Sequence, residues 1–151
     1  RFHDQAGGSA AIAAYLTGAT ANDVVITGVE IDNSAASFGS IYASMGTGDT
    51  VEVSSNYVHD SSGFLGGIGV FGDGEAKIFN NFVYNHYGAI GIGAENALIY
   101  NNIISKSAAT GLSLGDNTQA YYNTIVNGDK GIVGIGTTGA PARVSRRSIT
   151  A

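Results

Sequence analysis

One repeated phrase constrains the fold of this chain more than any other feature of its sequence. The phrase Ala-x-Ile-x-x-Asn-x-Val, at residues 76–83, returns 21 positions later at residues 97–104 as Ala-x-Ile-x-x-Asn-x-Ile. An apolar pair follows each copy, first at residues 90 and 92 and then at residues 112 and 114. A period of about 20 residues with short alternating apolar runs, and without helical spacing, is typical of stacked β-coils.

The rest of the chain aligns with this repeat when the Asn of the phrase is taken as a reference column. Its members are Val29, Asn56, Asn81, Asn102 and Asn123. The residues three positions before and two positions after each member are small or apolar. Because alternate residues of a strand face the same side, we place these columns and the later apolar pairs in the core. The later pairs are Ile41 and Ala43, Ile68 and Val70, Ile90 and Ile92, Leu112 and Leu114, and Ile132 and Gly134.

Both ends of the chain also carry parts of the repeat. Residues 1–14 match residues 57–70, and residues 142–151 match residues 97–106, which puts Arg147 in the reference column. The first match pairs Phe2 with Val58, His3 with His59, Asp4 with Asp60 and Ile12 with Ile68. A solenoid cut within a coil exposes strand edges and core. We therefore predict one domain over residues 1–151, either a fragment or a unit whose open ends are covered by partners.

Composition argues against several classes of protein. With 151 residues, of which 44% are apolar, the chain is long enough for one domain with a buried core. All twelve acidic residues lie in residues 1–140 beside four Lys or Arg, and this acidic body argues against nucleic acid as a partner. Cysteine is absent, so no disulfide can form. No apolar run approaches the roughly 18 residues that span a bilayer, so we predict no membrane insertion.

The coils resemble those of the right-handed parallel β-helix proteins of the pectate-lyase-like superfamily, whose generic repeat reads v-x-I-x-n-N-x-I-x-n-n-x-x-x-G-I-x-I. Residues 78–92 and 99–114 carry the resemblance most clearly, and residues 24–43, 51–70 and 120–134 carry it more loosely. The resemblance implies an all-β fold, namely a right-handed single-stranded parallel β-helix (solenoid) of about six coils. It also implies an exported protein that is extracellular or on the cell surface.

The same resemblance gives the reference column a structural role. Inward Asn residues of this family stack from coil to coil, so Asn56, Asn81, Asn102 and Asn123 are expected to form an asparagine ladder. Buried amides are tolerated only when their donors and acceptors are paired, and an isolated one costs a few kcal/mol.

An outward column, three positions after the reference column, carries the residues that we consider for catalysis. Stacked coils place equivalent side chains about 4.8 Å apart, so a column in the alignment is a row in space. We predict a polysaccharide groove lined by Asp32, His59 and Tyr84 of this column and by Lys106 of the neighbouring column, with His86 nearby. In a lyase-like reaction His59 or Tyr84 is the base, Lys106 neutralises the sugar carboxylate and Asp32 orients His59.

The same column also has a purely structural interpretation. The positions beside it hold Asp4, Asn33, Asp60, Asn85, Lys106 and Asn127. Asp and Asn suit turns because their side chains bond nearby backbone and tolerate unusual dihedral angles. Histidines beside such turns are often ordinary surface polar groups, so both interpretations remain open at this point.

Two further rows suggest ligands. Asp73, Glu95 and Asp116 stand in Gly-led turns one coil apart, and such carboxylates can supply the oxygen ligands of Ca²⁺, the one cofactor that we consider. The alternative is a set of solvated turns.

The second row is aromatic. Phe79, Tyr100 and Tyr121 form it, with Tyr57 and Phe82 on a neighbouring column. Exposed aromatic side chains can stack on sugar rings, and equally they can stack on one another as a ladder.

Two functions remain open from the sequence. The first is binding or lyase-like cleavage of an extracellular polysaccharide along the side of the solenoid. The second is a non-catalytic scaffold, such as an adhesin stalk, a tailspike shaft or a filament subunit that associates end to end. The Arg-Pro and paired-Asp signatures expected of pectate lyases and polygalacturonases are absent from this chain, so whether it is an enzyme stays open.

Overall fold

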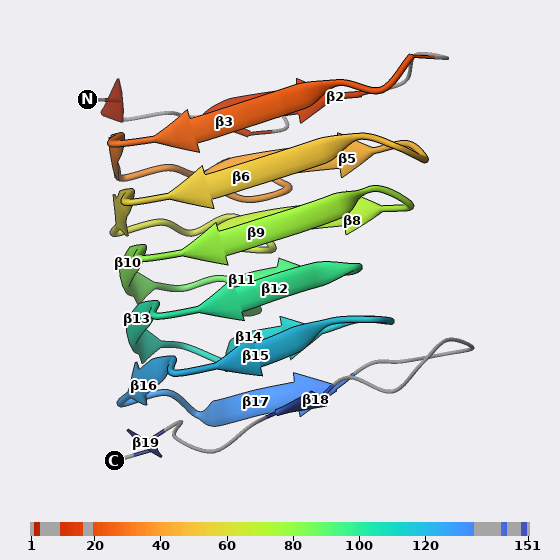
Figure 1. The fold of residues 1–151 in the computed structure, drawn as a ribbon. Coiled ribbons are helices and arrows are strands. Elements are labelled where there is room, and N and C mark those ends of the chain that lie inside the picture. Colours follow the sequence, from red (N-terminus) through yellow and green to blue (C-terminus); the bar gives the residue numbers. More distant parts are fainter. Residues whose placement is uncertain (1, 4–9, 17–19, 135–142, 145–148, 151) are drawn as a thin grey trace.

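The chain forms a coil of short strands that stack into three parallel sheets (Figure 1). The structure, a computed structural model, describes residues 2–3, 10–16, 20–134, 143–144 and 149–150. Every regular element within these residues is a strand, and none of them forms a helix that is long and apolar enough to span a membrane.

The three sheets contain seven, six and six strands. Sheet A has the order β1 (Phe2–His3), β4 (Glu30–Asp32), β7 (Tyr57–His59), β10 (Phe82–His86), β13 (Ile103–Ser107), β16 (Thr124–Val126) and β19 (Ile149–Thr150). Sheet B consists of β2 (Ile12–Tyr15), β5 (Ile41–Met45), β8 (Ile68–Gly72), β11 (Ile90–Ala94), β14 (Thr110–Leu114) and β17 (Lys130–Gly134). Sheet C consists of β3 (Asp23–Thr27), β6 (Thr50–Ser54), β9 (Glu75–Phe79), β12 (Ala97–Tyr100), β15 (Gln119–Tyr121) and β18 (Arg143–Val144).

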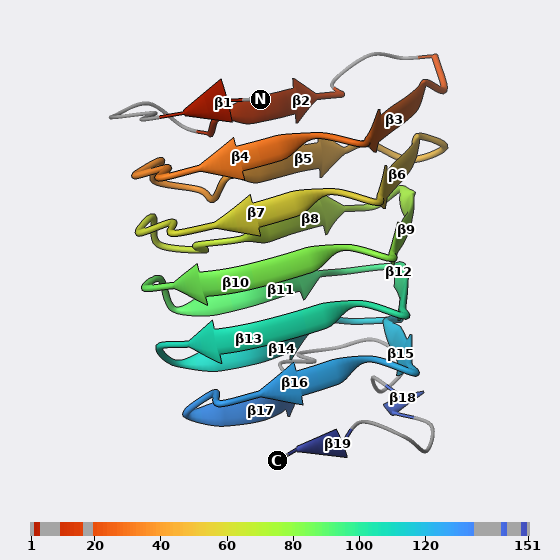
Figure 2. The same ribbon diagram turned by 90° about the vertical axis from the view of Figure 1, so that its left-hand side faces the viewer.

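Each strand pairs in parallel with the equivalent strands of the coils before and after it. Along one coil the chain passes from β9 in sheet C through a short bend to β10 in sheet A, and then through a turn to β11 in sheet B. Figure 2 shows the strands of sheet A lying side by side, with sheet B behind them. The predicted all-β parallel solenoid is confirmed.

The inward columns form one continuous core between the three sheets. In sheet A, Val58, Val83 and Ile104 pair in register, and all three side chains are fully buried. Ile68, Ile92 and Leu112 do the same in sheet B. Full burial of a Val, Leu or Ile side chain contributes roughly 1.5–3 kcal/mol. The apolar columns are therefore the main stabilising feature, as their period predicts.

One of the predicted inward pairs is wrong. Ile92 and Ala94, not Ile90 and Ile92, pair with Ile68 and Val70 and are fully buried. Ile90 is half-buried, and its side chain lies over Gly93 on the outer side of sheet B. The turn after β10 shifts the inward position along β11 relative to the alignment.

The asparagine ladder is confirmed by its hydrogen bonds. The Nδ2 atoms of Asn56, Asn81 and Asn102 each donate to the Oδ1 atom of the next Asn at 2.9–3.0 Å. The same oxygens accept from the backbone N–H groups of the preceding members at 3.0 Å. All four Asn residues are buried, yet their amides are paired, which removes the desolvation cost of burial.

The predicted strand pairing is observed near the N-terminal end of the chain but only partly near the C-terminal end. Phe2, His3 and Ile12 pair with Ile31, Asp32 and Ile41, which continues the predicted columns, whereas Asp4 lies outside the described residues. Near the other end Val144 keeps the predicted register. Beyond it, Ile149 pairs with Thr124 and Thr150 pairs with Ile125. The alignment predicts that Ile149 pairs with Ile125, so the register is shifted by one residue. The reason is that the connection after β18 is one residue longer than the connection after β15. Arg147 lies outside the described residues.

Candidate functional site

The candidate site lies on the outer face of sheet A, where three rows of outward residues run along the solenoid. The apolar row consists of Tyr57, Phe82 and Ile103, which pair across β7, β10 and β13. The polar row consists of Asp32, His59, Tyr84 and Ser105, two positions further along the same strands and β4. The turn row consists of Asn33, Asp60, Asn85, Lys106 and Asn127, each next to the polar row.

The turn row is built from left-handed backbone. All five of its members have φ between 51° and 54°. Asn and Asp adopt this conformation more readily than other non-glycine residues, because their short polar side chains bond locally. The turn interpretation of this column is therefore correct. It is compatible with a site, since the side chains of Asp60 and Lys106 reach the polar row.

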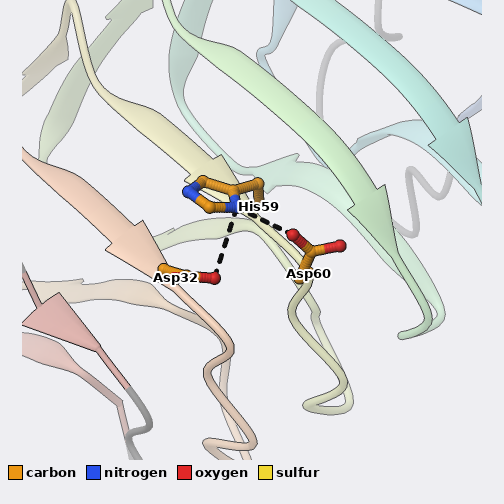
Figure 3. Close-up of side chains that lie close together, drawn as sticks. All are labelled: Asp32, His59 and Asp60. Carbon is orange, nitrogen blue, oxygen red and sulfur yellow. Dashed lines mark hydrogen bonds and ion pairs between the residues drawn. The ribbon is translucent and has the colours of Figure 1, made fainter.

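A histidine surrounded by carboxylates forms the most buried part of the site (Figure 3). The Nδ1 atom of His59 lies 2.8 Å from Asp60 Oδ2 and 3.3 Å from Asp32 Oδ1. Its Nε2 atom lies 3.4 Å from Glu30 Oε1. The exposed fractions of the His59 and Asp32 side chains are 11% and 12%. Thus both ring nitrogens face acidic groups in a partly dry environment.

These carboxylates change the pKa of His59. Burial alone lowers this pKa, but hydrogen bonds to Asp60 and Glu30 and the charge of Asp32 outweigh burial, so the net effect is a raised pKa. The pKa of Asp60 is lowered, mainly by its hydrogen bond with His59 and next by that from the Asn85 side chain. The cluster therefore favours a positive charge at the ring and negative charges around it.

Tyr84 and Lys106 form a second polar pair on the same face. The Lys106 Nζ atom donates a hydrogen bond to Tyr84 Oη at 2.8 Å and lies 5.0 Å from the centre of its ring. The hydrogen bond to Tyr84 is the main reason that the pKa of Lys106 is raised. Lys106 therefore stays charged at neutral pH.

Aromatic contacts connect the two polar groups. The ring of Tyr57 stacks on His59 at 4.3 Å between centroids and on Phe82 at 5.2 Å. Phe82 in turn contacts the ring of Tyr84 at 5.9 Å. Tyr57 and Phe82 each keep 37% of their surface exposed. The sequence indicated their column but did not assign them to the site, and it missed the contributions of Glu30 and Asp60. The period-2 alternation, which puts Glu30 on the same face as Asp32, was the available signal.

The prediction that His86 lies in the groove is wrong. Its side chain is fully buried, and neither ring nitrogen has a hydrogen-bond partner among the described residues. The left-handed residue Asn85 interrupts the alternation of β10, so Val83 and His86 both face inward. His86 pairs with Ser107 of the next coil, which is also buried. Burial lowers the pKa of His86 to about 4.

The predicted aromatic row lies on a different sheet. Phe79, Tyr100 and Tyr121 are half-buried at the ends of β9, β12 and β15 in sheet C. Their rings stack at 4.9 and 5.1 Å with planes within 2° of parallel. The three rings therefore stack on one another as a ladder, and they lie on sheet C, away from the His59 face. A role of this row in sugar binding stays a prediction.

Among the described residues, the three carboxylates of the predicted acidic row do not converge as a group, and Ca²⁺ binding by this row stays a prediction. Asp73, Glu95 and Asp116 follow β8, β11 and β14. Within the described part of the chain, the residues whose His or carboxylate ligand atoms converge as a group of three are instead Asp32, His59 and Asp60. The turn from Val70 to Ala76 is longer than the turn from Ala94 to Ala97, so the carboxylates do not stack.

A hollow of about 590 Å³ opens on the outer face of sheet C, away from the His59 face. Outward side chains of β3, β6, β9 and β12 line it, including Asp23, Glu52, Glu75 and Lys77. It contains none of the residues that the sequence nominated. We therefore treat it as separate from the candidate site.

Comparison with known proteins supports the fold. The family model described as a right-handed beta helix region matches residues 7–149. No curated protein matches the chain. No solved structure matches it either.

Proposed function

The chain belongs to the right-handed β-helix family, and we propose that it binds a polysaccharide along the outer face of sheet A. The observation that carries this proposal is the half-exposed apolar row of Tyr57, Phe82 and Ile103 beside a polar row. Aromatic faces stack on sugar rings, and neighbouring polar groups can bond the hydroxyls. A linear chain lying along the solenoid axis would meet one such position in each coil.

The charges on this face favour a neutral polysaccharide. Glu30, Asp32 and Asp60 surround His59, and Lys106 is the one Lys or Arg on the described strands of sheet A. A polyanion would meet three carboxylates, and like charges brought together cost free energy. This replaces the acidic sugar of the sequence-based hypothesis, in which Lys106 neutralises the sugar carboxylate, with a neutral one.

Binding is better supported than lyase-like cleavage. Both nitrogens of His59 already face carboxylates and its pKa is raised, so the imidazole is a poor candidate for a free general base. Tyr84 beside Lys106 remains the pair that could move a proton from a sugar. We therefore keep cleavage as the lesser form of the proposal, and an exported location accompanies both forms.

Affinity electrophoresis in gels that contain neutral or acidic polysaccharides tests the proposal. We expect a neutral polysaccharide to retard the wild type, and the double variant Tyr57→Ala/Phe82→Ala to bind at least about 10-fold more weakly, since each ring contributes about 0.5–1.5 kcal/mol beyond its area burial. Phe64→Ala is the matched control, because Phe64 is 69% exposed but lies outside the three rows. Retardation that is unchanged in the double variant, or absent for every polysaccharide, would reject the proposal.

The scaffold alternative predicts a different result on the same variants. A filament subunit that associates end to end would self-associate through its terminal coils and not through the apolar row. Sedimentation velocity at increasing concentration would then show self-association that persists in Tyr57→Ala/Phe82→Ala, with no retardation by polysaccharide. The release of unsaturated sugar ends, measured by ultraviolet absorbance, distinguishes cleavage from binding, and Tyr84→Phe should abolish it.

A further inference from the structure

Three ligand atoms from two neighbouring coils converge beside the apolar row. They are His59 Nδ1 and carboxylate oxygens of Asp32 and Asp60, and all lie within 4.8 Å of one another. We propose that these three side chains bind a divalent transition-metal ion of the Zn²⁺ type. These residues belong to the polar and turn rows of the candidate site, but the metal proposal does not rest on polysaccharide binding.

The distances suit such an ion. Zn²⁺ binds imidazole nitrogen at about 2.0–2.1 Å and carboxylate oxygen at about 2.0–2.2 Å. Two ligand atoms on one ion are therefore separated by at most roughly 4.3 Å, from these bond lengths. The Nδ1 atom of His59 already lies 2.8 Å from Asp60 Oδ2 and 3.3 Å from Asp32 Oδ1. Small adjustments of the side chains would complete the geometry.

A proton on Nδ1 satisfies this arrangement less well than a metal ion. One N–H group points along a single direction, whereas two carboxylates approach the same nitrogen. The two acidic groups repel each other and lose hydration in a partly buried place, and a protonated His59 ring offsets only one of their two negative charges. A divalent ion offsets both charges and accepts all three ligands at once.

The second nitrogen of the ring provides independent support. A histidine that binds a metal commonly donates its other N–H to a carboxylate, which fixes the tautomer and the ring orientation. In His59, Nε2 lies 3.4 Å from Glu30 Oε1 while Nδ1 faces the other ligands. Tyr57 stacks on the ring face at 4.3 Å and further restricts its rotation. The ring is therefore already held in the orientation that metal binding requires.

The remaining ligands are also held in place. The side-chain amide of Asn85 donates to Asp60 Oδ1, which leaves Oδ2 directed at His59. Asp32 and His59 are adjacent in strand register on β4 and β7. Ligands on paired strands lose little conformational freedom on binding. Imidazole with two carboxylates favours a transition metal over Ca²⁺, which prefers oxygen ligands alone.

Isothermal titration calorimetry of the metal-free full chain with ZnCl₂, and separately with CaCl₂, tests the site. We expect one saturable Zn²⁺ site and weaker or no binding of Ca²⁺. His59→Asn and Asp32→Asn should each weaken Zn²⁺ binding at least about 10-fold. Loss of a residue that only supports a metal ligand already weakens metal binding about 10–100-fold, and these two residues bind the ion directly. Asp73→Asn and Glu95→Gln, which remove carboxylates outside the cluster, should bind as the wild type.

A third ligand variant guards against a folding failure. Asp60→Asn keeps a side chain that suits the left-handed backbone at this position, where φ is 53°, while it removes the charge. We expect it to stay folded, with at most a small drop in its metal-free melting temperature, and to lose most of the rise that Zn²⁺ produces in the wild type. Co²⁺ serves as a spectroscopic probe, and its visible spectrum should differ between the wild type and His59→Asn. Zn²⁺ binding that persists unchanged in Asp60→Asn and His59→Asn, or the lack of saturable binding to the wild type, would overturn the proposal.

Discussion

The left-handed backbone of Asn85 directs the ring of His86 into the core, where it packs without a hydrogen-bond partner among the described residues. A histidine that looks like a surface residue in the sequence is therefore fully buried and neutral. The adjacent coils hold buried serines at the equivalent positions, including Ser61 and Ser107.

His86 should make the fold sensitive to acid. Its pKa is about 4 in the folded chain against 6.5 for an ordinary histidine, so the unfolded chain binds more protons between these values. Stability is then complete above pH 6.5 and falls as the pH drops towards 4, by about 3 kcal/mol at 1.36 kcal/mol per pKa unit. Urea unfolding of the wild type and of His86→Ser over this range measures the effect. The variant should be less stable overall but show a smaller slope, and equal slopes would contradict the prediction.

His59 should have the opposite pH dependence in the metal-free chain. Its pKa is raised in the folded state, so its contribution to stability is complete below the ordinary pKa of 6.5 and is lost as the pH rises through the raised value. The difference in unfolding free energy between the wild type and His59→Gln should therefore shrink as the pH rises above neutrality. A chelator keeps the chain free of metal during this measurement. A difference that grows with pH would show that the carboxylates do not stabilise the charged ring.

The asparagine ladder should be sensitive to the loss of one member. Asn81→Ala removes the acceptor of the Asn56 backbone and side-chain N–H groups and the donor to Val53 and Asn102. Each buried group left unpaired costs about 1–3 kcal/mol, so we expect a loss of at least about 3 kcal/mol in urea unfolding. Gln119→Ala, on an exposed strand position, should stay within about 0.5 kcal/mol of the wild type.

Lys106 should tolerate a change to Asn but not to Val. The residue has φ of 54°, a conformation that Asn adopts readily and that strains a β-branched residue by about 1–2 kcal/mol. Thermal unfolding should place Lys106→Asn close to the wild type and Lys106→Val clearly below it. Because Lys106→Asn removes the hydrogen bond to Tyr84 without unfolding the coil, it also measures what that pair contributes to sugar binding.

The small residue at position 91 should be required for coil stacking. A Cβ atom on Gly91 would lie 2.7 Å from the Gly111 carbonyl oxygen and 2.9 Å from His86 Nε2. Gly91→Ala should therefore lower stability by about 1–3 kcal/mol, the usual cost of overpacking. At Gly134 a Cβ atom would meet no described atom within 4 Å, so Gly134→Ala is the matched control. Equal melting temperatures for the two variants would show that the coils separate easily.

Much of the fold follows from the sequence because a solenoid repeats one local rule. The alternation of apolar residues predicts which positions face inward, and the Asn column predicts the asparagine ladder. Both predictions hold at Ile78, Asn81 and Val83. The alignment fails at Ile90 and at Ile149. In both places a turn or connection differs in length from the equivalent one in the neighbouring coil, which shifts the register. No local sequence pattern marks this difference in length.

The sequence by itself determined the column of most residues, and it thereby placed Asp32 beside His59 on neighbouring strands. Only the tertiary structure decided the direction of each side chain at the corners of the coil. Left-handed backbone at Asp60 and Asn85 brings one carboxylate onto the His59 ring and sends His86 inside. The physical reason is that alternation holds only within a strand, whereas a single residue with positive φ reverses it, and the packing of adjacent coils selects where that residue stands.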